Sequence, residues 1–124
     1  MIAVDTSSLI AYLAGEDGRD VEAIDLALAR NEVHLPPVVV TETLSAPKAA
    51  RRIERLILAL PILAIADGYW ERAGRLRRQI LARGLRAPLA DALICQSCLD
   101  HGVPLITRDD DFVHFANHCG LKLA

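Results

Sequence analysis

The sequence has few cysteines and few aromatic residues, and it lacks a long uninterrupted apolar run. Three cysteines are an odd number in a chain of 124 residues that can bury its own core, so we expect no disulfide framework and a cytoplasmic location. The longest apolar run, 56–66, is short and is broken by Pro61, and no basic leader precedes the apolar residues at the N-terminus. We therefore expect neither secretion nor a membrane span.

Proline and glycine, at six and seven residues, form no low-complexity tract, and no internal repeat is present. Hydrophobic residues make up 52% of the chain and charged residues 24%, which is a globular composition. A chain of this length suits one domain that buries about two thirds of its unfolded surface. We expect a single domain over residues 1–124.

Charge is unevenly distributed, although the net charge is only −2. Residues 1–47 carry two basic and eight acidic side chains, residues 48–86 carry ten and three, and residues 87–124 carry two and five. Either the basic middle segment meets a polyanion, or its arginines are ordinary solvated side chains on helix surfaces.

Apolar periodicity predicts strands that alternate with helices. Short strands are expected at 1–4, 33–35, 62–65, 105–107 and 121–123. Helices are expected at 9–13, 21–31, 48–60, 69–82, 90–99 and 112–118. Segment 36–47 is ambiguous, because its valines favour a strand whereas its paired prolines could open a helix. The alternation predicts an α/β fold with a mostly parallel sheet and helices on both faces.

Two local predictions concern individual side chains. Thr6 or Ser7 is expected to cap the first helix. In helix 69–82, the spacing predicts an inward face and an outward, basic face. The inward residues are expected to be Trp70, Ala73, Leu76 and Ile80, and the outward ones Arg72, Arg75, Arg78 and Arg83.

Segment 87–112 organises the rest of the chain. Pro88 opens and Gly102 ends a helix that holds Asp91 near its N-terminus. The strand that follows leads directly to three consecutive acids, 109–111. Because open α/β sheets bind ligands beyond the carboxyl ends of their strands, the chemistry is expected there.

Four acids lie where apolar runs meet element ends, and a fifth is close by. They are Asp5, Glu42, Asp91 and Asp109, with Asp111 nearby. If these carboxylates converge, their mutual repulsion makes the site costly unless a cation binds there. Hard oxygen ligands suit Mg²⁺ or Mn²⁺. Such a site can hydrolyse a phosphodiester through a cation-activated water. The alternative for each acid alone is a helix cap or a surface residue.

Four segments, IAVDTSSLIAYL, TETL, APLADALI and LITRDDDF, together resemble the PIN domain family, in particular its VapC-like toxin ribonucleases. The resemblance covers nearly the whole chain. It implies a three-layer α/β/α sandwich on a mostly parallel sheet and metal-dependent RNA cleavage by the toxin of a type II toxin/antitoxin system. It also places Glu42 near a helix start. The implied catalytic carboxylates are Asp5, Glu42, Asp91 and Asp109.

The same resemblance implies that Asp5, Asp91 and Asp109 bind Mg²⁺ or Mn²⁺. Asp111 is an alternative to Asp109, which fits better because it follows Thr-Arg directly. An antitoxin is expected to lay a helix into an apolar groove and to bring a tail, often basic, toward the acids. A homodimer is expected as well.

Five further residues are candidates for contact with the RNA. Thr6 and Ser7 either touch the scissile phosphate or cap a helix, and Thr107 either bonds a carboxylate or only ends a strand. Arg86 and Arg108 either steer phosphates or pair with the site acids.

Other types of site are less well supported. Cys95, Cys98 and His101 have a metal-like spacing but no second ligand pair, which favours small core residues. Aspartyl-phosphate phosphatases need a second Asp where this chain has Ser7. The remaining alternative is a non-catalytic PIN-like module that binds RNA or protein, although the loss of acids expected of such a module is absent.

Overall fold

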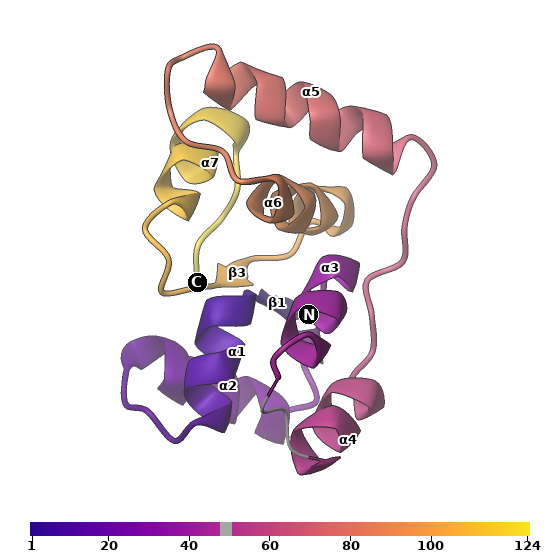
Figure 1. Ribbon diagram of the computed structural model, residues 1–124, viewed down its shortest axis with the longest axis vertical. Coiled ribbons are helices and arrows are strands. Elements are labelled where there is room, and N and C mark those ends of the chain that lie inside the picture. The colour runs from indigo at the N-terminus through magenta and orange to yellow at the C-terminus, as the bar shows by residue number, and fades with distance from the viewer. Residues whose placement is uncertain (48–50) are drawn as a thin grey trace.

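The computed structural model describes residues 1–47 and 51–124, which form seven helices and a three-stranded sheet (Figure 1). The elements in chain order are β1 (Ile2–Val4), α1 (Thr6–Leu13), α2 (Arg19–Ala29), β2 (Val33–His34), α3 (Pro37–Leu44), α4 (Arg51–Ala59), α5 (Tyr69–Leu81), α6 (Leu89–His101), β3 (Leu105–Ile106) and α7 (Phe112–Cys119). None of the helices in these residues has the length and apolar character needed to cross a membrane.

The sheet is parallel, with β1 between β2 and β3. Ala3 pairs with both His34 and Leu105, and Val4 pairs with Ile106. Ala3 and Val4 are fully buried, as expected for a strand covered on both faces. This register brings the residues that follow β1 and β3 to the same edge of the sheet.

Helices cover both faces of the sheet. Figure 1 shows α1 and α2 on one side and α6 and α7 on the other, with α5 lying outside α6. Fully buried side chains from both layers, including Leu9, Ile24, Ile94 and Phe112, form the core. The predicted α/β/α sandwich on a parallel sheet is confirmed.

Two predicted strands are wrong, because each is reduced to a single bridge. Segment 62–65 forms one isolated backbone bridge, between Ile62 and Leu35, and segment 121–123 forms one between Leu123 and Leu105. In each segment one apolar side chain is buried and its neighbours are exposed. A single buried residue is too little to hold the whole segment against a sheet.

The ambiguous segment forms α3, with Pro37 at the first helical position, where its missing N–H costs nothing. Glu42 is the sixth of the eight residues of α3, so its predicted position near the helix start is wrong. The predicted helix 48–60 is present as α4, and its first three residues lie outside the described part of the chain.

The inward face of α5 is shifted by one residue at its N-terminal end. Trp70 is 60% exposed, contrary to prediction, whereas Tyr69 is 3% exposed. The Tyr69 hydroxyl donates a 2.7 Å hydrogen bond to the carbonyl of Leu93 in α6, which satisfies its buried polar group. The large ring of Trp70 consequently lies on the solvent side.

Candidate metal centre

Three aspartates converge beyond the carboxyl end of β3. Asp91, Asp109 and Asp111 each offer a carboxylate oxygen, and these oxygens lie within 4.8 Å of one another. Asp91 is the third residue of α6, and the other two lie in the segment that joins β3 to α7. Asp109 Oδ1 accepts a 2.9 Å hydrogen bond from the Asp111 amide, which fixes their relative position.

Asp5 lies directly after β1 and is 3% exposed. Its Oδ2 accepts hydrogen bonds from Ser7 Oγ at 2.5 Å and from Thr107 Oγ1 at 2.8 Å. Burial raises the pKa of Asp5, the two hydroxyl hydrogen bonds oppose that rise, and the charge of Asp109 adds to it. Asp5 is thus a buried carboxyl group within electrostatic reach of the aspartate cluster.

Asp91 is the most strongly perturbed acid of the site. Burial, together with the charges of Asp109, Asp5, Asp111 and Glu42, raises the pKa of Asp91 to about 7. Its Oδ2 is buried and has no hydrogen-bond partner among the described residues. An unpartnered oxygen surrounded by carboxylates fits a hard divalent cation, which would neutralise the repulsion and complete the bonding of Asp91.

Glu42 reaches this group from α3, as its effect on the pKa of Asp91 indicates. Glu42 Oε1 accepts a 2.7 Å hydrogen bond from Thr6 Oγ1 at the start of α1. The hydroxyls of Thr6 and Ser7 therefore both bind carboxylates, and the prediction that one of them caps α1 is wrong. Asp5 occupies the cap position, without a side-chain capping bond, because its carboxylate faces Ser7 and Thr107.

The two candidate arginines have different surroundings. Arg86 is largely exposed and lies 3.5 Å from Asp111 Oδ2, so it pairs with a site acid. Arg108 instead pairs with Asp20 at 2.7 Å and with Glu16 at 3.6 Å. Its hydrogen bond lowers the pKa of Asp20 to about 2. No sequence signal indicated this pair, since its members lie 88 positions apart.

The expected structural role of the cysteines is confirmed. Cys95 and Cys98 are buried and free. The ring of His101 lies elsewhere, with Nε2 at 2.7 Å from the carbonyl of Ala64. By contrast, the role of Ser7 in holding Asp5 was missed, although a hydroxyl two residues after a helix-opening Asp is a common local hydrogen-bond pattern.

The model of the family described as PIN domain matches residues 2–117. The chain belongs to the PIN domain family. No curated protein sequence matches it significantly. Among solved structures, this PIN domain resembles a chain of the VapBC2 complex from Rickettsia felis, with 17% identity, a TM-score of 0.75, and coverage of 100% of this chain and 98% of the other.

Two further solved structures contain similar chains. In FitAcB from Neisseria gonorrhoeae the identity is 21% and the TM-score 0.73, with 99% and 96% of the chains covered. In a toxin-antitoxin complex from Klebsiella pneumoniae the identity is 24% and the TM-score 0.70, with 98% and 95% covered. At these identities the likeness establishes the fold, and the predicted PIN fold is confirmed.

Proposed function

We propose that this PIN domain is a Mg²⁺- or Mn²⁺-dependent endoribonuclease that acts in the cytoplasm as the toxin of a type II toxin/antitoxin pair, with residues 1–124 forming one domain. The observation that carries the proposal is the unpartnered, buried Oδ2 of Asp91 beside the carboxylates of Asp109 and Asp111. A group of acids that includes a buried oxygen without a partner is costly unless a cation binds it.

Asp5, Asp91 and Asp109 are proposed to hold the cation, with Asp111 as a further ligand. When bound, the cation polarises the phosphodiester and lowers the pKa of the attacking water. Ser7 and Thr107 hold Asp5 in place, and Thr6 holds one oxygen of Glu42. The second oxygen of Glu42 is then available to accept a proton from the water.

Roles toward RNA follow from the same contacts. The hydroxyls of Thr6, Ser7 and Thr107 bind carboxylates. We therefore propose that their main role is to position the site acids rather than to contact RNA phosphates. Arg86 makes only an exposed 3.5 Å ion pair with Asp111, which contributes little free energy. We propose that its guanidinium can exchange this carboxylate for an RNA phosphate. Arg108 is held by Asp20 and Glu16, and we assign it a structural role.

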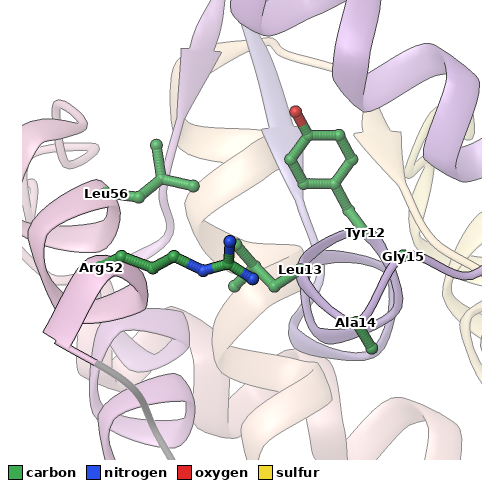
Figure 2. A pocket seen from close by; sticks show the side chains of 6 residues that line it. All are labelled: Tyr12, Leu13, Ala14, Gly15, Arg52 and Leu56. Carbon is green, nitrogen blue, oxygen red and sulfur yellow. The ribbon is translucent and has the colours of Figure 1, made fainter.

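An antitoxin helix is proposed to occupy the cavity between α1 and α4. This cavity, of about 490 Å³, is lined by side chains that include Tyr12, Leu13 and Leu56, with the Arg52 guanidinium extending across it (Figure 2). An amphipathic helix could place apolar residues here and an acidic residue on Arg52. Its tail, if basic, would match the charge of the acids. A homodimer of the PIN domain is also part of the proposal.

A growth experiment tests the toxin assignment. Expression of the wild-type chain should arrest growth, and co-expression of the protein encoded immediately upstream should relieve the arrest. Asp91→Asn should be harmless at equal expression, because it removes a charge that the cation needs. If wild type and Asp91→Asn affect growth equally, the proposal fails, and a non-catalytic binding module becomes the better account.

A further inference from the structure

A second hollow, of about 470 Å³, lies between α5 and the start of α6. Its lining consists of four residues of α5, the residue that caps the end of α5 and one residue of α6: Gly74, Arg77, Arg78, Leu81, Ala82 and Leu89. None of these six residues is acidic. Leu81 and Leu89 are 45% and 62% exposed, so the hollow has an apolar floor with guanidinium groups beside it.

Gly74 has no structural reason to be a glycine. It lies within α5, where glycine is a poor helix former, and it has an ordinary helical conformation. A Cβ built at this position would meet no atom of the described chain within 4 Å. Packing within the described chain therefore does not require a glycine at this position. The absence of a side chain at Gly74 instead leaves the hollow open.

The hollow lies at the start of α6, the helix that also carries Asp91. Leu89 opens α6, whose third residue is Asp91, and Arg86 of the preceding segment contacts Asp111. Arg77 Nε donates a 2.7 Å hydrogen bond to the carbonyl of Ala87, which fixes the arginine against this same segment. An RNA strand that crosses the start of α6 on its way to the acids would therefore also pass the hollow.

We propose that this hollow binds a nucleotide that flanks the cleaved phosphodiester in a single-stranded RNA. The base lies on Gly74, Leu81 and Leu89, and its phosphate contacts Arg78. No carboxylate in residues 1–47 or 51–124 lies within 4.0 Å of an Arg78 nitrogen, so this guanidinium has a free charge to offer. The inference rests on the proposed ribonuclease function.

Charge complementarity favours RNA over a second copy of the chain. The helix that supplies most of the hollow carries four arginines and one glutamate. A two-fold dimer across this face would bring the same arginines against one another, whereas the RNA backbone would neutralise them. Apolar side chains beside a basic groove also suit the exposed faces of unpaired bases.

Binding to a fluorescently labelled, mixed-sequence 12-nucleotide RNA in EDTA tests the inference without cleavage. Gly74→Leu places a side chain in the hollow and should weaken RNA binding about tenfold, because the base can no longer pack against its apolar surface. Its control, Gln79→Leu, adds the same side chain at an exposed position of α5 outside the hollow and should leave affinity unchanged.

Salt dependence separates the two kinds of contact. Arg78→Ala should weaken binding and lower the slope of log affinity against log salt by about 0.7, the value for one phosphate on a single strand. Gly74→Leu should leave that slope unchanged. Arg75→Ala removes the same charge from an exposed position outside the hollow and should leave the affinity within about twofold of wild type.

Wild-type affinity in both Gly74→Leu and Arg78→Ala overturns the inference, even if the protein cleaves RNA. If Gly74→Leu changes the sedimenting mass while RNA affinity stays constant, the hollow is an interface between copies and the inference is wrong. RNA binding that depends on the hollow, in a protein that never cleaves, would instead refute the ribonuclease function alone. Should Gly74→Leu fail to fold, Arg78→Ala against Arg75→Ala decides the question.

Discussion

Thr107 Oγ1 donates a 2.8 Å hydrogen bond to Asp5 Oδ2 and so joins the ends of β3 and β1 across 102 positions of sequence. Thr107 Oγ1 also accepts a 3.0 Å hydrogen bond from the Asp109 amide. One hydroxyl therefore sets the position of Asp5 relative to the segment that carries Asp109 and Asp111. The parallel register of the two strands makes this contact possible.

Replacement of Thr107 by Val tests this positioning. The variant keeps the shape of the side chain but leaves Asp5 without one donor, which should cost about 1–2 kcal/mol of unfolding free energy. RNA cleavage should fall about tenfold or more, because misplaced ligands weaken cation binding. Thr107→Ser retains the hydroxyl and should restore both properties. Equal activity of Thr107→Val and wild type would remove Thr107 from the site.

Asp91 should give the metal-free protein an unusual pH dependence. Its pKa is about 7 in the folded protein, against an ordinary value near 4, so over this interval the folded state holds a proton that the unfolded state has released. The unfolding free energy should therefore fall as pH rises from about 4 to about 7, by at most about 1.4 kcal/mol per pH unit for this one proton. Urea unfolding in EDTA measures it.

Asp91→Asn should remove most of this fall. The raised pKa of Asp5 acts in the same direction, so a smaller slope should remain in the variant. Saturating Mn²⁺ should flatten the wild-type profile between about pH 4 and 7, because a bound cation keeps the carboxylates ionised and so lowers the folded-state pKa of Asp91. A wild-type free energy that rises with pH in EDTA would contradict the clustering of these acids.

Thermal melting distinguishes the aspartates that bind the cation from those that do not. At pH 8 in EDTA, Asp91→Asn should melt at the same temperature as wild type or higher, because repulsion is relieved, yet it should gain less from added Mn²⁺. Asp109→Asn and Asp111→Asn, measured in parallel, reveal which of the two binds the cation more tightly. Asp110→Asn is the matched control, since Asp110 lies between them and is exposed. A substitution that leaves the response to metal unaltered excludes its residue from the centre.

If the antitoxin binds the cavity between α1 and α4 as proposed, substitutions of the residues that line this cavity should weaken the complex. Leu56→Asp places a charge in the cavity and should weaken antitoxin binding about tenfold or more, as truncations at interface centres do. Leu58→Asp is the control, because Leu58 lies on the same helix but is 65% exposed and outside this cavity. Calorimetric titration with the antitoxin measures both. Equal losses in the two variants would point to a general effect on α4.

The sequence was sufficient to predict the helices that have long apolar periodicity and the edge of the sheet where acids follow the strands. Apolar spacing located α5 and α6 nearly to the residue, and Gly102 marked the end of α6 in a left-handed conformation that suits glycine. Asp5 and Asp109 could be expected at one edge of the sheet because each follows a parallel strand, and the resemblance to PIN domains added Asp91 to the predicted set. These predictions depend on local pattern and on topology.

Contacts between distant side chains could not be predicted. Arg108 was expected near RNA or the site acids, yet Asp20 binds it, and local sequence carries no information on a partner so far away. Which of Tyr69 and Trp70 faces the core depends on a hydrogen bond to α6, which periodicity does not encode. The hydrogen bond between the Glu42 carboxylate and Thr6 likewise joins two different helices, which local sequence does not indicate.

Cleavage of a single-stranded RNA by metal-free protein, titrated with Mn²⁺ and with Mg²⁺, tests the central claim most directly. Wild type should be inactive in EDTA and should gain activity with either cation, while Asp91→Asn should stay lower by orders of magnitude at every cation concentration. The control variant Asp110→Asn should follow wild type. Undiminished cleavage in EDTA, or equal rates for wild type and Asp91→Asn, would contradict the account.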